Sequence, residues 1–198
     1  MNESFAYVNR RGRRYFLGRG TTKRGKERFF FSRRPPANPV NRIPEGCEIT
    51  ESVNGIVSLR RSGRQSIFEE ETSVVRSELA RHAHLRRHRA AARGDAIAIY
   101  EPLGAQSEAS LESISGRRTA LLGSGGSFLD AVAADARYCA VMRFVLLDCA
   151  SREFEAQRMC YRGGMEGWIT IGGGLLPALA RKFVRHNATE DFFEILPS

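Results

Sequence analysis

The chain has 198 residues, a net charge of +9 and 42% hydrophobic residues, which fits one or two globular domains with cores of their own. No apolar run approaches the roughly 18 residues that a membrane-spanning helix needs. The charged N-terminus lacks the apolar segment of a signal peptide. We therefore expect a soluble, cytoplasmic protein with no membrane partner.

The basic charge is concentrated in the first half of the chain. Residues 1–100 hold 21 Lys and Arg against 10 Asp and Glu, whereas residues 101–198 have a small acidic excess. This asymmetry favours a polyanion as the partner of the first half. A general preference for Arg, with only three Lys in the whole chain, is the alternative explanation.

Two β-type runs rich in aromatic residues, Phe5–Leu17 and Glu27–Ser32, flank a basic connection that contains glycines. A turn at residues 9–12 divides the first run, and the second run contains three consecutive Phe residues. This pattern predicts a cationic β-hairpin near the N-terminus. The prolines that follow end regular structure.

A second hairpin is predicted within Cys47–Arg61, where Asn54-Gly55 joins two β-prone runs. Asn-Gly tolerates the positive φ angles of a type I′ turn, so we expect that turn here. Apolar residues then recur at helical spacing from Ile67 to His84 and predict an amphipathic helix. Ser66 and Glu69 have the spacing of a capping box at its start.

The remaining elements are predicted from shorter patterns. We expect a hairpin around Arg93-Gly94-Asp95 and a Gly/Ser-rich linker or loop at residues 103–126. After the linker, the sequence predicts a helix at 128–137, strands at 138–147, 153–161 and 168–171, a helix at 175–186, and an apolar tail.

Together these elements predict an α+β protein in which antiparallel β-hairpins pack with a few short helices in two small modules. The basic N-terminal module covers residues 1–102 and includes the helix at 67–84. Residues 103–126 connect it to a C-terminal α+β module at 127–198.

The basic hairpin is the candidate binding site. Clustered Lys and Arg bind phosphate backbones, and exposed aromatic rings let single strands stack. The alternative is a solvated basic hairpin whose aromatic rings belong to the core. The nucleic-acid hypothesis rests on Arg13, Arg14, Tyr15, Arg19, Lys23, Arg24, Lys26, Arg28 and Phe30.

Metal and catalytic signals are weaker. His84 and His88 are four residues apart, as helical metal ligands can be, but no acidic or Cys partner lies at ligand spacing. Asp148 and Glu155 could hold Mg²⁺ as in some nucleases, although the Lys of the usual motif is absent. We expect no metal, no cofactor and no catalytic residue.

Three other features have structural explanations. The four cysteines form no C-x-x-C pair, so we expect buried free thiols. The glycine runs at 123–127 and 172–174 each precede a predicted helix without matching a phosphate-binding motif, and a linker and a tight turn are favoured. Trp168 is expected in the core.

Several segments resemble those of a group of uncharacterised bacterial proteins: YVNRRGRRYFL, GKERFFFS, IPEGCEI, NGIVSLRR, MRFVL and RMCYRGGMEGWI. They cover about half of the chain. The group has no established activity, so the resemblance implies a bacterial, soluble origin and two recurring blocks, without functional residues.

We therefore expect a non-enzymatic nucleic-acid-binding protein that uses the N-terminal hairpin, with DNA or RNA as its partner. Two alternatives stay open. One is a protein-interaction or regulatory module whose basic face meets an acidic protein, and the other is a metal-dependent nuclease.

Overall fold

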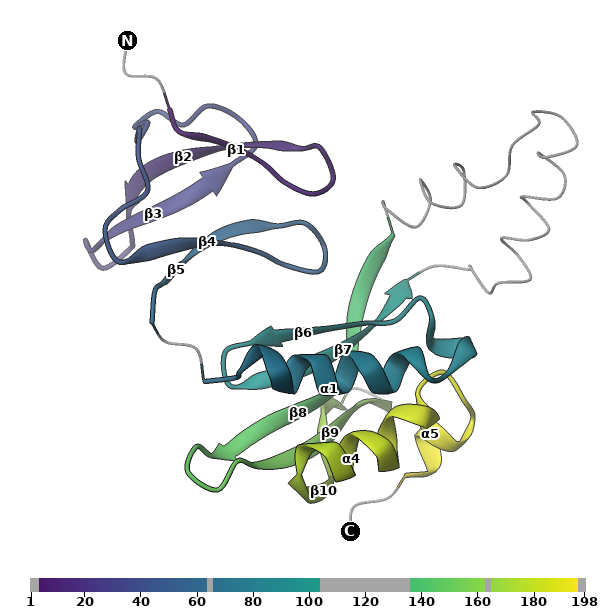
Figure 1. Ribbon diagram of the computed structural model, residues 1–198. Helices are drawn as coiled ribbons and strands as arrows, with labels where there is room; N and C mark the ends of the chain where they lie inside the picture. Colours follow the sequence, from purple (N-terminus) through teal and green to yellow (C-terminus); the bar gives the residue numbers. More distant parts are fainter. Residues whose placement is uncertain (1–3, 64–65, 104–135, 163–164, 196–198) are drawn as a thin grey trace, which may run out of the picture. The chain divides into compact units, whose positions relative to one another are not determined.

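A computed structural model of the chain divides into two compact units, with the boundary between Arg64 and Gln65 (Figure 1). The structure describes residues 4–63 of unit 1 and residues 66–103, 136–162 and 165–195 of unit 2. The sheets are antiparallel and a few short helices accompany them. The predicted α+β class is confirmed.

Unit 1 is built from β-strands. A three-stranded sheet has the order β1-β2-β3, and β4 and β5 pair separately. Both predicted hairpins, β2–β3 and β4–β5, are present. Leu17 and Val57 are among its buried core residues. The strands are β1 (Ala6–Val8), β2 (Arg14–Thr21), β3 (Glu27–Ser32), β4 (Cys47–Glu51) and β5 (Val57–Arg61).

All three hairpin tips of unit 1 use one kind of turn, at residues 9–13, 22–26 and 52–56. In each tip the amide of the first residue donates to the carbonyl of the fifth residue. The fourth residue is a glycine, and its amide donates to the carbonyl of the first residue. The three glycines have φ of +69°, +75° and +73°. This is a type I turn followed by a left-handed glycine.

The side chain of the first residue closes each of these turns. The fifth residue's amide donates to Asn9 Oδ1 at 2.8 Å, to Thr22 Oγ1 at 3.1 Å and to Ser52 Oγ at 3.0 Å. The predicted type I′ turn at Asn54-Gly55 is wrong, because that turn needs positive φ at both residues and only Gly55 has it.

The tip at residues 9–13 is hydrogen-bonded to the tip at residues 52–56. Asn9 Nδ2 donates to Gly55 O at 2.6 Å, and Arg10 Nη2 donates to Ser52 O at 2.6 Å. Arg10 Nε also lies 3.1 Å from Glu51 Oε1. These contacts join the two sheets of unit 1. The positive charge of Arg10 is paired with Glu51 within the unit.

Unit 2 is one five-stranded sheet with helices on one face (Figure 1). The strand order is β10-β9-β8-β7-β6, so neighbours in sequence pair throughout. Helices α1 and α4 pack against each other and against the sheet. The elements are α1 (Glu69–Ala80), η1 (Ala83–Leu85), β6 (Arg89–Arg93), β7 (Ala96–Leu103), β8 (Arg137–Asp148), β9 (Glu153–Arg162), β10 (Met165–Leu175), α4 (Leu176–Phe183), η2 (Val184–His186) and α5 (Asp191–Glu194).

The core of unit 2 lies between the helices and the sheet. Val75 and Leu79 of α1 meet Phe144, Phe154 and other buried strand residues there. Gly172 lets α4 approach β10 closely: a Cβ at this position would lie 3.0 Å from the Phe183 ring. A glycine in a strand is expected at such a close approach.

The β8–β9 loop holds the start of α1. Phe68 N donates to Glu71 Oε2 at 2.8 Å, so Glu71 caps the helix instead of the predicted Glu69. Arg152 donates to both oxygens of Glu71, at 2.9 and 2.5 Å, and its guanidinium lies 4.4 Å from the Phe68 ring centre. Three acidic residues in the first turn suit the positive end of the helix dipole.

The division of the chain differs from the predicted boundary near residue 102. The predicted N-terminal module ended after β7, but β7 pairs with β8 along its length, and α1 packs on α4. Both elements therefore belong to unit 2. The division depends on the pairing of strands that are far apart in the chain. Local sequence patterns carry no information about that pairing.

Other differences lie near the C-terminus. The glycines at 172–174 continue β10 instead of forming a turn, and the helix predicted at 175–186 consists of α4 followed by η2. Leu103, the first residue of the linker predicted at 103–126, is the last residue of β7. The rest of that linker and most of the helix predicted at 128–137 lie outside the described residues. Among the helices that the structure describes, none has the length and apolar character required to cross a membrane.

Candidate nucleic-acid interface

The alternation of side chains along β2 and β3 gives the sheet of unit 1 two different faces. Leu17 pairs with Phe31 and Tyr15 is two residues away, so this face contributes to the core. Gly18 pairs with Phe30 and Gly20 with Arg28 on the other face. We call this second face the glycine face.

Phe30 lies flat across the glycine face. A Cβ on Gly18 would be 3.1 Å from Phe30 Cζ, and one on Gly20 would be 3.3 Å from Phe30 Cε1. Pro36 adjoins Gly18, and the Arg28 guanidinium lies 5.5 Å from the centre of the Phe30 ring. The two glycines make room for the half-buried ring, which leaves part of it at the surface beside a cation.

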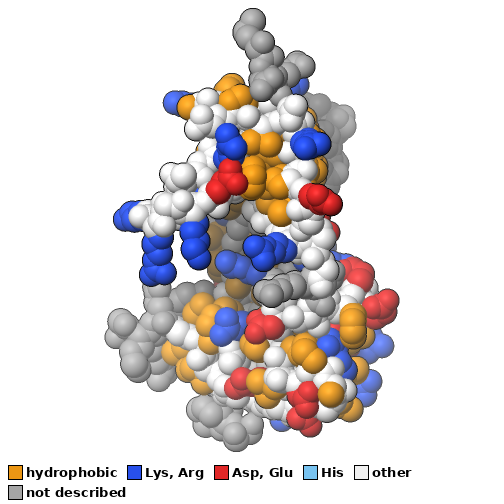
Figure 2. All heavy atoms as spheres, turned by 90° about the vertical axis from the view of Figure 1, so that its left-hand side faces the viewer, with side chains coloured by type: hydrophobic (Ala, Val, Ile, Leu, Met, Phe, Trp, Pro, Cys, Tyr) orange, Lys and Arg blue, Asp and Glu red, His pale blue; other side chains and the backbone are white. Residues whose placement is uncertain are grey.

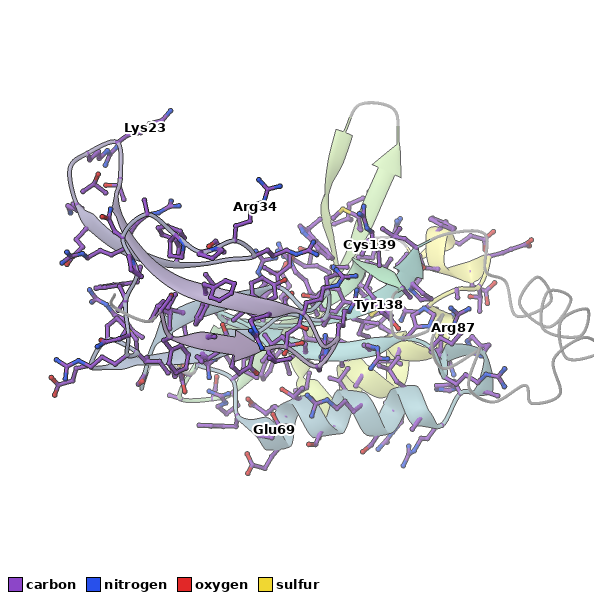
Figure 3. The ribbon with its side chains drawn as sticks, turned by 90° about the horizontal axis from the view of Figure 1, so that it is seen from above. Lys23, Arg34, Glu69, Arg87, Tyr138 and Cys139 are labelled. Carbon is purple, nitrogen blue, oxygen red and sulfur yellow. The ribbon has the colours of Figure 1, made fainter. Side chains whose placement is uncertain are left out.

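Positive charge extends from this face to the tip of the hairpin. Lys23, Arg24 and Lys26 are exposed there, and Lys23 points away from the strands (Figure 3). Arg14 and Arg28 are exposed on the glycine face itself. On one side of unit 1, a hydrophobic patch is bordered by several Lys and Arg side chains and by fewer acidic ones (Figure 2).

Acidic residues neutralise little of this charge. Residues 4–63 contain fourteen Lys and Arg and only four Glu. Three of those Glu pair with arginines: Glu27 with Arg19, Glu48 with Arg60, and Glu51 with Arg10. Unit 1 therefore has a field that attracts anions.

The structure brings six of the nine predicted site residues to the glycine face and the adjoining tip: Arg14, Arg28, Phe30, Lys23, Arg24 and Lys26. Arg13 closes the first tip, and Arg19 lies on the opposite face in an ion pair with Glu27. Tyr15 is buried, and its hydroxyl donates to Gly55 O at 3.2 Å. Tyr15 is thus a core residue and offers no stacking surface.

Sequence reasoning missed the contribution of Gly18 and Gly20. Their spacing of two places both on one strand face, directly opposite Phe30 and Arg28. Arg33 and Arg34 are also exposed just beyond β3, and Figure 3 shows Arg34 directed outward. The Gly-x-Gly spacing was visible in the sequence, but its meaning depended on the strand register.

The metal candidates acquire separate partners. His84 Nε2 lies 3.2 Å from Arg185 O, and burial, followed by the charge of His84, lowers the pKa of His88 to about 4. Asp148 accepts the Ala150 amide, which holds the pKa of this exposed carboxyl below its usual range. Glu155 accepts from Gln157 and Thr170. In the part of the chain that the structure describes, no three His, Cys, Asp or Glu form a metal-binding group.

Trp168 and the cysteines differ from expectation in their burial. Trp168 is half-buried, and the Arg143 guanidinium stacks 4.3 Å from its ring centre. All four thiols are free, but Cys149 is exposed and the other three are half-buried. The expectation of buried thiols is therefore wrong.

Comparisons with protein-family models, curated proteins and solved structures find no match to this chain. This agrees with a resemblance to proteins that have no established activity.

Proposed function

We propose that the protein binds single-stranded nucleic acid through the glycine face and the β2–β3 tip of unit 1. The observation that carries this proposal is the Phe30 ring, which lies over Gly18 and Gly20 with Arg28 beside it. A base can stack on an aromatic ring whatever its sequence, and the neighbouring arginine can reach the phosphate. The binding is non-enzymatic and cytoplasmic in this proposal.

The charge at the tip supplies the second part of the proposed site. Arg14, Lys23, Arg24, Lys26 and Arg28 lie along one hairpin, so a strand stacked at Phe30 would run past them. Each phosphate contact on a single strand contributes about −0.7 to the slope of log affinity against log salt. Five contacts would give a slope of roughly −3.5.

The test is fluorescence anisotropy with labelled oligo-dT, oligo-rU and a duplex of the same length, at several salt concentrations. We expect the single strands to bind more tightly than the duplex. The slope of their log affinity against log salt should be roughly −3.5. Replacing Lys23, Arg24 and Lys26 together by Ala should reduce the slope to roughly −1.4. Phe30→Leu keeps an apolar contact but removes the ring, and should weaken single-strand binding about tenfold.

The matched control removes three exposed cations from unit 2, by Arg181→Ala, Lys182→Ala and Arg185→Ala. This variant has the same net charge as the tip variant and should bind almost as tightly as the unchanged protein. Equal losses in the two triple variants would refute the site, because they would show a response to net charge alone.

An acidic polypeptide is the alternative partner, because it is also attracted to a cationic surface. Polyglutamate can contact the tip but has no bases to stack, so its affinity should not respond to Phe30→Leu. If polyglutamate binds as tightly as oligo-dT and Phe30→Leu affects neither, the proposed function is wrong and an acidic protein partner is favoured.

A further inference from the structure

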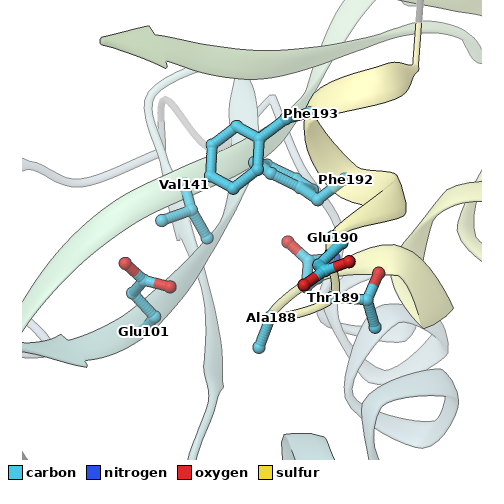
Figure 4. A pocket seen from close by; sticks show the side chains of 8 residues that line it. Glu101, Val141, Ala188, Thr189, Glu190, Phe192 and Phe193 are labelled. Atoms are coloured by element: carbon cyan, nitrogen blue, oxygen red, sulfur yellow. The ribbon is translucent and has the colours of Figure 1, made fainter.

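A pocket of about 440 Å³ lies in unit 2, at the end of the sheet where α5 packs. It is lined by Glu101 of β7, Val141 of β8, and residues 187–190, 192 and 193 of the C-terminal segment. Its volume is within the range of small-molecule sites. In Figure 4, Glu101 and Glu190 lie on opposite sides of the pocket, with the rings of Phe192 and Phe193 beside them.

The polar groups of this pocket are mainly hydrogen-bond acceptors. Glu101 and Glu190 contribute carboxylates, and the hydroxyl of Thr189 already donates to His186 O at 2.7 Å. Lys and Arg are absent from the lining that the described residues form. A ligand that suits such a lining must itself donate hydrogen bonds.

Asn187 also lines the pocket, and its side-chain oxygen is an acceptor without a partner among the described residues. This residue is fully buried at 0% exposure, and its Nδ2 donates to Val184 O at 2.8 Å and approaches Met142 Sδ at 3.6 Å. Its Oδ1, on the other side of the planar amide, has no hydrogen-bond partner among the described residues. A buried acceptor of this kind costs free energy unless something donates to it.

The apolar part of the lining is aromatic. Phe192 is buried, Phe193 is 62% exposed, and their rings meet edge to face with centres 5.4 Å apart. Arg158 of β9 holds this segment in place, because its guanidinium donates to the carbonyls of Phe193 and Ile195. Aromatic faces attract cations as well as apolar groups.

From this lining we propose that the pocket binds a small organic ammonium ion, with its charged nitrogen between Glu101 and Glu190 and its apolar stem against Phe192 and Phe193. Glu101 is half-buried, and burial raises the pKa of its carboxyl, while a hydrogen bond from Cys139 acts in the opposite direction. A bound ammonium ion would compensate this half-buried carboxylate. This site is independent of the one proposed on unit 1.

The test uses three probes of similar shape on the full-length protein: 2-phenylethylammonium, neutral 2-phenylethanol and anionic 3-phenylpropanoate. Binding is followed by amide chemical shifts of residues 187–193 in NMR titrations. A nine-atom amine of ordinary ligand efficiency should bind with a dissociation constant on the order of 1 mM. We expect the alcohol to bind at least about tenfold more weakly and the acid not to bind.

Two variants locate the charge and the aromatic contact. Glu101→Gln keeps the shape of the side chain and should weaken amine binding about tenfold, and the exposed Phe193→Ala should also weaken it. Glu194→Gln is the matched control, because Glu194 is exposed in the same helix but does not line the pocket. This control should bind the amine normally.

The source of the ammonium group is tested with a blocked lysine, Nα-acetyl-lysine methylamide. Tighter binding of this probe than of phenylethylammonium would identify a peptide side chain as the occupant, and the reverse order would identify a free amine. Equal binding of the amine, alcohol and acid, unchanged amine binding by Glu101→Gln, or the absence of any shift at residues 187–193 would each overturn the proposal.

Discussion

Asn9 Nδ2 donates a hydrogen bond of 2.6 Å to the backbone carbonyl of Gly55, 46 positions further along the chain. Asn9 is only 4% exposed, and its Oδ1 accepts the amides of Arg11 and Arg13. One side chain thus closes its own turn and attaches that turn to the other hairpin of unit 1.

We expect Asn9→Ala to destabilise unit 1 by about 3 kcal/mol, because three hydrogen bonds are lost at a buried position. Hydrogen exchange of the amides in residues 4–63 measures this loss. Asn9→Asp should also destabilise, since it keeps the acceptor but places a carboxylate against the Gly55 carbonyl. Asn38→Ala, at an exposed asparagine in the same unit, is the control, and exchange no faster in Asn9→Ala than in this control would contradict the prediction.

Gly18→Ala should disturb the surface beneath Phe30. The new Cβ would lie 2.6 Å from Pro36 Cβ and 3.1 Å from Phe30 Cζ, so the ring or the proline must move. We expect a loss of roughly 1 to 3 kcal/mol in stability, together with weaker binding of oligo-dT. Thermal unfolding and anisotropy measure the two effects.

Gly20→Ala is the matched comparison for this substitution. Its nearest contact would be Phe30 Cε1 at 3.3 Å, a distance that a small ring movement can relieve. It should therefore cost less than Gly18→Ala. Equal effects of the two substitutions would show that the close approach of Phe30 and Pro36 to Gly18 is unimportant.

His88 should make unit 2 less stable in weak acid. Burial lowers its pKa from 6.5 to about 4, and His84 contributes in the same direction. Because the unfolded chain takes up this proton first, the contribution of His88 is complete above about pH 6.5 and decreases as the pH falls towards 4. The ring is only partly buried, so we expect a loss of roughly 1 to 2 kcal/mol after allowance for solvent screening.

Urea unfolding at pH 7.5 and pH 4.5, compared between the unchanged protein and His88→Gln, measures this contribution. The variant should lose less stability on acidification. His84→Gln removes a neighbouring charge and should reduce the loss by a smaller amount. An identical pH dependence in all three proteins would contradict the assignment to His88.

Arg158 should determine whether the C-terminal segment stays attached to the sheet. It is buried, and it donates to Ile195 O at 3.0 Å and Phe193 O at 3.3 Å. We expect Arg158→Met to cost about 2 to 4 kcal/mol and to increase hydrogen exchange in residues 187–195. Arg158→Lys should hold the C-terminal segment only partly, because a single ammonium group lacks the forked geometry with which the guanidinium reaches both carbonyls.

Arg143→Met is the control for Arg158. Arg143 lies on the neighbouring strand, where it donates to Gln157 and stacks on Trp168. Its loss should leave exchange in residues 187–195 unchanged. If both substitutions increase exchange there equally, Arg158 has no special role in holding that segment.

The elements that the sequence predicted well are those that local chemistry determines. Glycines and alternating β-type residues located the β2–β3 and β4–β5 hairpins, and helical periodicity located α1. The helix cap was misplaced because the acceptor, Glu71, is also held by Arg152 from a distant loop. Local signals of similar strength at Ser66 and Glu69 could not reveal that contact.

The features that escaped prediction depend on residues far apart in the chain. Tyr15 was predicted to be a stacking residue because its hydrogen bond to Gly55, 40 positions away, is not visible in the sequence. Glu101 and Asn187 line one pocket although 86 positions separate them. The boundary between the units likewise depends on the pairing of β7 with β8. Strand register and sheet order, which fix all three, are non-local properties.

In the turn that the three tips share, the residues that determine the backbone shape differ from those whose side chains determine the chemical character of the loop. The first side chain and the glycine hold each turn, while the two residues between them are Arg10-Arg11, Lys23-Arg24 or Val53-Asn54. Those two positions accept cationic, apolar and amide side chains on the same backbone. The ligand preference proposed for the β2–β3 tip could therefore be changed by substitution at residues 23 and 24 while the hairpin stays intact, which makes this loop a convenient place to redesign recognition.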